Sequence, residues 1–208
     1  MSIKLLYEEL YKHESGSQRN PQIIIDTFER NESAINEMDV NSSAENYAFI
    51  RLVTSDYACS LVLRECYTKA LPFLNRSISL WENSRDIEKG ALSNSRWYET
   101  LRFDRGRSYN FKKKYKEAKN DFSWLNKHFP DNDNYKVWLA HCQNGPLIRI
   151  QNFLLFSVLS FLVFVPIVIK KEHHALRLTF LSIATIGYIV FLVLRIILWL
   201  RQKKLRGN

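Results

Sequence analysis

Residues 150–169 read IQNFLLFSVLSFLVFVPIVI, and residues 178–200 read LTFLSIATIGYIVFLVLRIILWL. The first stretch contains no charged residue, and the second contains only Arg195, near its end. A helix of roughly 20 apolar residues is long enough to cross about 30 Å of hydrocarbon. Buried helices of soluble domains normally show polar residues along one face, and neither stretch does. The two stretches therefore predict a hairpin of two transmembrane helices rather than a pair of buried core helices.

The hairpin divides the chain of 208 residues into a helical part and a membrane part. A chain of this length has room for one domain of ordinary size and an appendage. We expect an N-terminal helical pair, a helical repeat domain, a first transmembrane helix, a short loop, a second transmembrane helix and a basic tail. In that order, these segments are residues 1–43, 44–146, 147–170, 171–175, 176–201 and 202–208. The N-terminal pair could be a degenerate copy of the repeat.

The net charge of +9 is concentrated around the hairpin. Residues 149–208 contain nine Lys or Arg and one acid, whereas residues 1–148 contain twenty-one basic and twenty acidic residues. A basic excess that flanks apolar spans indicates membrane topology and contact with anionic lipid, and it argues against nucleic acid as a partner. The residues expected to meet lipid headgroups are Arg201, Lys203, Lys204 and Arg206.

The basic residues also predict the orientation of the hairpin. The side that holds both chain ends has five basic residues near the spans, whereas the connecting segment has three, Lys170, Lys171 and Arg177. Because the more basic side is usually cytoplasmic, we expect both termini and the helical domain in the cytoplasm. The first residues of the chain lack the apolar core of a signal peptide, which agrees with this orientation.

Residues 1–146 show the pattern of an all-α domain. Apolar residues recur at spacings of three and four, and no segment keeps the alternation typical of a β-strand. Asn20 and Pro21 are typical of the N-cap and the first residue of a helix. The pattern predicts about seven helices, stacked as antiparallel hairpins in a solenoid, before the two transmembrane helices. The predicted helices are residues 2–13, 21–38, 44–64, 66–81, 94–110, 114–128 and 133–143.

Residues 99–132 contain an ordered set of small, aromatic and proline positions. The set is Gly106, Tyr109, Tyr115, Ala118, Phe122 and Pro130. Small residues allow two helices to cross closely, aromatic residues fill the space around the crossing, and the proline ends the second helix. The set resembles the tetratricopeptide repeat, a helix–turn–helix unit of 34 residues. The match is incomplete, because Arg102 and Arg105 stand where apolar residues are usual.

A weaker copy lies 48 residues upstream. There, the residues that correspond to Gly106, Tyr115, Ala118 and Phe122 are Ala58, Tyr67, Ala70 and Leu74. Leu139 and Ala140 begin a further helix, which would cap the stack. The alternative is a generic helical hairpin in which small residues and proline coincide by chance.

The resemblance implies a partner-binding face. Tetratricopeptide-like proteins typically hold peptide segments on a concave face that their first helices build. By register, that face consists of Phe103, Asp104, Arg107, Asn110, Trp138 and His141. These residues do not reproduce the Lys/Asn/Arg clamp that some members use for a terminal carboxylate. A peptide with mixed apolar and charged residues is therefore the expected partner.

The chain shows no pattern of catalysis, and we expect neither an enzyme nor a cofactor or metal. Its five histidines are scattered, and its three cysteines, Cys59, Cys66 and Cys142, lack metal-ligand spacing and are typical of reduced cytosolic thiols. His173 and His174 could bind a metal, although a solvated loop explains them equally. The lysine-rich residues 112–116 could bind an acidic partner or lipid, or could form a solvated turn.

The predicted spans lack the buried ionisable residues that mark ion and proton pathways, which argues against a transporter. Small residues at Ser182, Ala184 and Gly187 form a face for helix packing, which could join the two spans or join protomers into a homo-oligomer. The leading hypothesis is a membrane-anchored scaffold or adaptor that recruits a protein partner. The alternative is a membrane effector whose hairpin oligomerises and perturbs the bilayer when the helical domain senses a signal.

Overall fold

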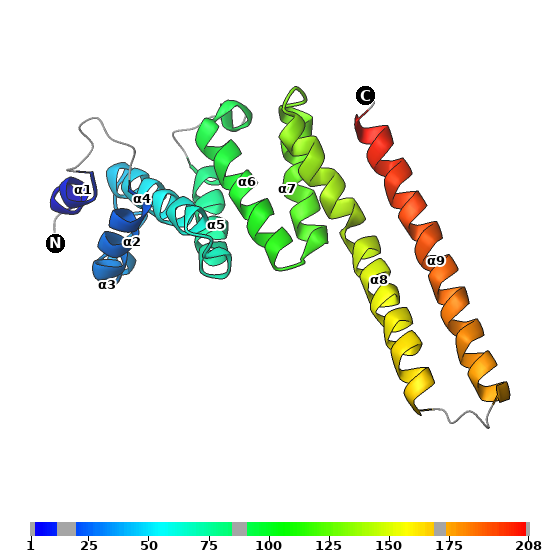
Figure 1. The fold of residues 1–208 in the computed structure, drawn as a ribbon. Helices are drawn as coiled ribbons and strands as arrows, with labels where there is room; N and C mark the ends of the chain where they lie inside the picture. The colour runs from blue at the N-terminus through cyan, green and yellow to red at the C-terminus, as the bar shows by residue number, and fades with distance from the viewer. Residues whose placement is uncertain (1–2, 12–19, 85–90, 169–173, 207–208) are drawn as a thin grey trace. The chain divides into compact units, whose positions relative to one another are not determined.

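The computed structural model describes residues 3–11, 20–84, 91–168 and 174–206, and within these ranges all regular structure is helical (Figure 1). The elements of the described ranges are α1 (Ile3–Tyr11), α2 (Pro21–Arg30), α3 (Glu32–Glu37), α4 (Ala44–Leu63), α5 (Tyr67–Glu82), the 3₁₀ turn η1 (Ala91–Asn94), α6 (Arg96–Phe111), α7 (Tyr115–His128), α8 (Asp133–Val168) and α9 (His174–Arg206). Contacts divide the chain into a helical unit, Met1–Tyr135, and a C-terminal unit, Lys136–Asn208. The prediction of an all-α chain is confirmed.

The helical unit is built by packing each helix against its neighbours in sequence. Helix α1 contacts α2, α2 contacts α4, α4 contacts α5, α5 contacts α6, and α6 contacts α7. Figure 1 shows α6 and α7 antiparallel, with their shared turn at the lower edge of the view. Helix α4 also contacts α1 and α6, so it lies at the centre of the unit. The predicted succession of antiparallel neighbours is confirmed.

Local chemistry explains where the helices begin and end. The side chain of Asn20 accepts a hydrogen bond from the Gln22 amide at 3.0 Å, and Pro21 is the first residue of α2, as the sequence predicts. The single helix predicted over residues 21–38 is wrong, because the structure divides it at Asn31 into α2 and α3. The Asn31 side chain donates to the Thr27 carbonyl at 2.9 Å, which competes with the helical backbone bonds at this point.

The core of the helical unit forms around α4. Phe28 of α2 stacks on Tyr57 of α4 with ring centroids 3.9 Å apart, and Phe73 of α5 meets the same tyrosine edge-on at 4.7 Å. The α4 side chains of Ile50 and Val53 are fully buried beside them. Each fully buried side chain of this size contributes about 1.5–3 kcal/mol by leaving water. Packing around α4 therefore holds α2 and α5 in place.

The crossing of α6 and α7 depends on a small residue. A Cβ atom added at Gly106 would lie 2.8 Å from Cζ of Phe122, closer than real carbon contacts allow. Ala118 and Phe122 are fully buried at the same crossing. The Phe122 ring therefore occupies the space that a side chain at position 106 would need.

The two hairpins α4–α5 and α6–α7 correspond at the predicted offset of 48 residues. Their turns close with the same backbone bond, from Cys66 to the Leu61 carbonyl at 2.8 Å and from Lys114 to the Tyr109 carbonyl at 2.9 Å. Glu65 in the first turn has a φ of 60°, and its counterpart in the second has a φ of 59°. Both turns are thus Schellman-type ends with a non-glycine residue in the left-handed region.

A buried acid also recurs at this offset. Asp56 of α4 and Asp104 of α6 are both buried. Asp56 accepts a hydrogen bond from the Tyr11 hydroxyl of α1, and Asp104 interacts with the thiol of Cys59 in α4. Each acid therefore faces a helix of the preceding layer, which supports an internal repeat rather than a chance likeness.

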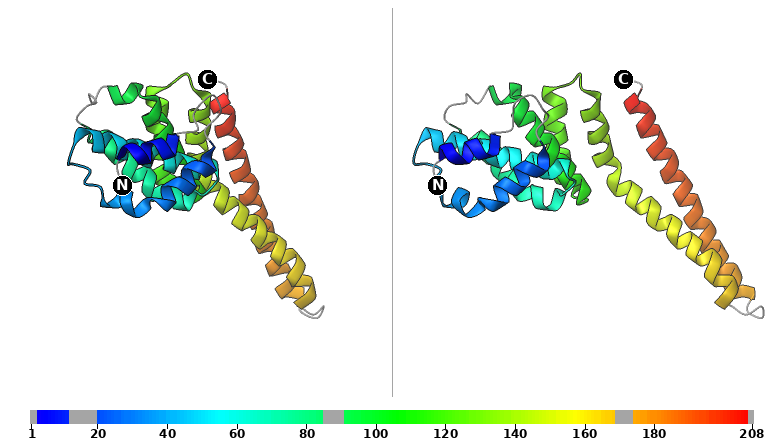
Figure 2. Two further views of the ribbon diagram at one scale, coloured as in Figure 1. Left: turned by 90° about the vertical axis from the view of Figure 1, so that its left-hand side faces the viewer. Right: turned by 60° about the vertical axis from the view of Figure 1, so that its left-hand side comes forward.

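The C-terminal unit consists of the rest of α8 and α9. The sequence predicts separate helices over residues 133–143 and 147–170, whereas the structure joins them into one helix that passes through Gly145 and Pro146. A proline removes one backbone hydrogen bond, and here the apolar run beyond it continues the helix. Both views of Figure 2 show α8 and α9 side by side near the end of α8. Phe161 and Phe180 meet there with ring centroids 6.0 Å apart.

The two long helices are apolar enough to cross a membrane by length and composition. The candidate segments are Asp133–Val163, with a mean hydropathy of 1.7, and Leu178–Arg201, with a mean hydropathy of 2.4. Most of their side chains are exposed, including Phe153 and Phe156 at 71% and 73%. Of the residues predicted to meet lipid headgroups, Arg201 is exposed, and the side chains of Lys203, Lys204 and Arg206 lie outside the described part of the chain.

Candidate functional site

One face of α6 brings together most of the predicted partner-binding residues of the helical unit. Glu99, Phe103, Arg107 and Asn110 are spaced by four, four and three residues, which aligns them along one side of the helix. We call these four residues the α6 stripe. All four are partly exposed. Asp104 departs from the prediction's geometry, because it is only 7% exposed and interacts with Cys59 of α4.

Arg107 is held in a frame of aromatic rings. Its guanidinium carbon lies 5.7 Å from the Tyr67 ring centroid and 5.8 Å from that of Phe103. One guanidinium nitrogen donates to the Tyr67 hydroxyl at 3.1 Å, and another lies 3.7 Å from a carboxylate oxygen of Asp104. Rings and hydrogen bonds that fix a guanidinium reduce the entropy lost when it binds a carboxylate or phosphate. Arg107 is therefore suited to hold an anionic group of a partner.

The buried carboxyl of Asp104 has an unusual pKa. Burial raises it to about 6, although Arg107 opposes the rise. The same burial, together with the charge of Asp104, raises the pKa of the Cys59 thiol well above its usual range. Cys59 is therefore an unreactive thiol, and Asp104 is a carboxyl that titrates in mildly acidic solution.

Asp104→Asn is expected to stabilise the protein at pH 8 but not at pH 4. Because the folded-state pKa exceeds the unfolded one, the folded chain binds the proton more tightly, and wild-type stability falls as pH rises between about 4 and 6. A difference of about two pKa units corresponds to about 3 kcal/mol. Denaturant unfolding of the full-length protein in mild detergent at both pH values measures this effect. An equal change at both pH values would contradict it.

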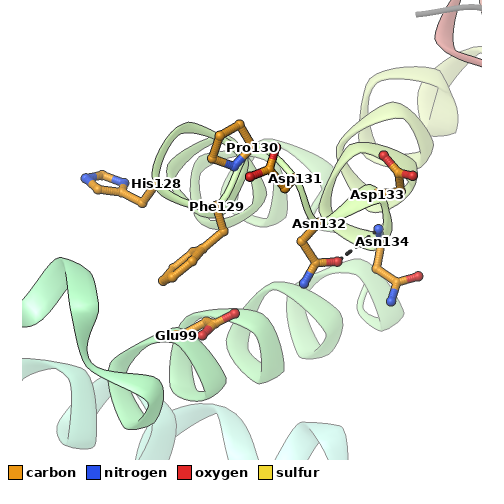
Figure 3. Close-up of a pocket in the computed structure, with 8 residues that line it drawn as sticks. All are labelled: Glu99, His128, Phe129, Pro130, Asp131, Asn132, Asp133 and Asn134. Carbon is orange, nitrogen blue, oxygen red and sulfur yellow. Dashed lines mark hydrogen bonds between the residues drawn. The ribbon is translucent and has the colours of Figure 1, made fainter.

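A pocket lies at the start of the stripe, between α6 and the turn that joins α7 to α8 (Figure 3). It has a volume of about 560 Å³ and is lined by Glu99, His128, Phe129, Pro130, Asp131, Asn132, Asp133 and Asn134. In Figure 3 the Phe129 ring points towards Glu99. The Glu99 carboxylate accepts a hydrogen bond from the Tyr135 hydroxyl. The lining offers carboxylates and amides beside an aromatic wall, which suits a cationic or donor-rich side chain.

Aromatic contacts connect this pocket with the rest of the stripe. The ring centroid of Tyr135 lies 5.6 Å from Phe103 and 6.2 Å from Phe129. Phe103 in turn lies beside Arg107. The pocket and Arg107 are thus two ends of one surface, acidic at one end, basic at the other and aromatic between. The acidic run of residues 131–134 is the signal by which the sequence could have revealed the pocket.

The two arginines that weaken the repeat pattern pair with an acid that the sequence analysis missed. Asp121 of α7 is 1% exposed and receives Arg102 at 3.0 Å and Arg105 at 2.6 Å. Arg105 also donates to Asn75 of α5 at 3.3 Å, and Arg102 pairs with Glu82 at 3.1 Å. Polar pairing thus joins α5, α6 and α7 where the repeat pattern expects apolar contacts. These residues position α6 and do not line the stripe.

The remaining predicted residues lie in the C-terminal unit. Trp138 and His141 of α8 lie with ring centroids 6.1 Å apart, and their membership of the partner-binding face stays a prediction. Ala184 of α9 is buried, and a Cβ added at Gly187 would lie 3.1 Å from Val158 of α8. Ser182 is exposed and donates to the Leu178 carbonyl at 2.9 Å. The packing of Gly187 against α8 accounts for a small residue at that position.

Within the described residues, no group of three His, Cys, Asp or Glu is arranged to hold a metal ion. His13 and His173 lie outside the described residues, as does the side chain of His174. The α6 stripe offers a cation, carboxylates and aromatic surface, which are groups suited to binding a peptide. No protein-family model matches the sequence, and no curated protein or solved structure matches it. The functional argument therefore rests on the geometry of the stripe.

Proposed function

We propose that this protein is a membrane-anchored adaptor whose tetratricopeptide-like helical unit binds a peptide segment of a protein partner. The observation on which the proposal rests is the α6 stripe, with Arg107 at one end and the Glu99 pocket at the other. A peptide with an acidic and a basic residue on either side of an apolar one would match this surface in charge. The partner would thereby be recruited to the bilayer.

The repeat supports the first half of this proposal. Stacked hairpins of the tetratricopeptide kind present their first helices, here α4 and α6, to partners. The 48-residue correspondence of turns and buried acids relates these two helices. The longer offset reflects the additional length of the segment between α5 and α6 compared with a repeat of 34 residues.

The exposed apolar helices support the second half. Large side chains such as Phe153, Phe156 and Ile186 remain exposed along α8 and α9. Soluble proteins rarely expose apolar surface on this scale, because water makes it costly. Lipid would cover these faces, and the basic residues at the ends of the spans favour a cytoplasmic helical unit. Protease protection in sealed membrane vesicles tests that orientation, since a protected helical unit would contradict it.

Arg107→Gln and Phe103→Ala are each expected to reduce partner capture at least about tenfold, because central aromatic and arginine residues dominate such interfaces. The measurement is cross-linking in intact membranes with the tagged full-length chain, followed by quantitative mass spectrometry. Lys119→Gln, an exposed position of α7 outside the stripe, is the matched control. Thermal unfolding of each variant checks that folding is retained. If both stripe variants capture the same proteins as the control, the stripe is not the binding face.

A membrane effector is the second candidate. The close approach of Gly187 to Val158 shows that α9 packs through small residues, and such packing could also join copies of the hairpin in the bilayer. Deleting residues 149–208 separates the two candidates. An adaptor without its hairpin still binds its partner and loses only its location. An effector instead depolarises membranes as an intact chain, and Gly187→Leu abolishes the depolarisation.

A further inference from the structure

Two neighbouring turns of the helical unit expose large apolar side chains. Leu63, at the end of α4, is 67% exposed, and Phe111, at the end of α6, is 61% exposed. Tyr67, the first residue of α5, packs against Phe111 with ring centroids 4.7 Å apart. This contact brings the α4–α5 turn and the α6–α7 turn together at one end of the stack. We call residues 63–67 and 111–114 the basic end.

The backbone fixes both apolar side chains in the same way. Leu63 and Phe111 each lie two residues before the left-handed residue of their turn, Glu65 and Lys113. Each turn is closed by a backbone bond of 2.8 or 2.9 Å. Schellman-type closure holds the end of a helix rigidly. The two side chains are therefore displayed by a preformed frame rather than by loose loops.

The charges of the stack are divided between its two ends. The basic end contains the exposed residues Arg64, Lys112, Lys113 and Lys114 and a single acid, Glu65. The opposite end includes the described turns at residues 38–43 and 129–134, which contain Asp39, Asp131 and Asp133 and no Lys or Arg. Apolar side chains among lysines form the combination by which proteins bind anionic bilayer surfaces.

We propose that the basic end docks on the surface of an anionic bilayer, with Leu63 and Phe111 entering the headgroup region. The inference rests on the proposed membrane anchor, because a tether makes docking an intramolecular event and strengthens a weak contact. Lipid is favoured over an acidic protein because the apolar side chains project from turns, whereas the described pocket that could receive a side chain lies at the acidic end. Docking would fix the height and tilt of the α6 stripe above the membrane.

A fluorophore on Cys66 tests the proposal directly, because this exposed cysteine lies within the α4–α5 turn. The full-length chain, with Cys59→Ala and Cys142→Ala to leave one thiol, is labelled with an environment-sensitive dye and assembled into nanodiscs. Nanodiscs that contain phosphatidylserine are compared with nanodiscs of phosphatidylcholine alone. Headgroup-region spin-labelled lipid is expected to quench the dye strongly in the first and weakly in the second.

Charge-reversal variants separate docking from general charge. Lys112→Glu, Lys113→Glu and Lys114→Glu together are expected to reduce the docked fraction at least about tenfold. Leu63→Ser with Phe111→Ser, which keeps every charge, is also expected to abolish quenching. The matched control reverses three basic residues outside the basic end, Arg96, Lys119 and Lys127, and should leave quenching unchanged. Circular dichroism confirms that each variant is helical.

The outcomes distinguish this inference from the anchor itself. A chain that does not insert into nanodiscs overturns both the anchor and the docking. An inserted chain whose dye stays unquenched in phosphatidylserine overturns the docking alone. An unquenched dye combined with loss of a captured acidic protein in the triple lysine variant assigns the basic end to that protein instead. Equal loss of quenching in the control variant would show general attraction of charge and would also overturn the proposal.

Discussion

Asp121→Ala is expected to destabilise the helical unit by about 3–5 kcal/mol, the largest effect of any polar substitution proposed for this chain. Asp121 is 1% exposed and receives both Arg102 and Arg105. Its removal leaves two largely buried guanidinium groups without their shared carboxylate. The cost of an uncompensated buried charge exceeds the energy that the ion pair itself contributes. Denaturant unfolding of the full-length protein in mild detergent, followed by tryptophan fluorescence, measures the change.

Glu82→Ala is the matched control, because Glu82 also pairs with Arg102 but is considerably exposed. Water screens that pair, so its loss should cost less than about 1 kcal/mol. Replacing Arg102, Arg105 and Asp121 together by methionine should restore most of the lost stability, because the whole buried network is then absent. If Asp121→Ala costs no more than Glu82→Ala, the network does not hold α6 on α7.

Gly106→Leu is expected to destabilise the α6–α7 hairpin by about 3 kcal/mol, at the upper end of the usual cost of overpacking. Even a single Cβ at this position would lie 2.8 Å from the Phe122 ring, and a leucine adds three further carbons. The helices would have to separate, which would also displace Phe103 and Arg107 of the stripe. The same unfolding measurement, together with partner capture, checks both consequences.

The double variant Gly106→Leu/Phe122→Ala tests the physical reason. Removing the Phe122 ring leaves space that the new leucine can occupy, so the pair should be more stable than the sum of the single changes predicts. Phe122→Ala alone is expected to cost about 3–5 kcal/mol, because the ring is fully buried. Simple additivity of the two changes would show that Gly106 and Phe122 do not share one crossing.

Local sequence chemistry determined the features that depend on a few adjacent residues. Asn20 and Pro21 start α2 as predicted, because capping involves only neighbouring backbone groups. The apolar lengths of the last two helices and the 48-residue register are also readable from the sequence, since both are patterns of spacing. The opposite error occurred at Pro146, where a local breaker lies within one continuous helix.

The tertiary structure alone decided which side chains are buried and which partners they meet. Asp104 shares the stretch of α6 that carries Phe103 and Arg107, yet α4 covers it and raises its pKa. Asp121 is an ordinary surface acid by sequence, and only the approach of α6 makes it the partner of two arginines. The pocket beside Glu99 forms from segments about thirty residues apart. Periodicity specifies the faces of a helix, but which face is covered depends on the helices that pack against it.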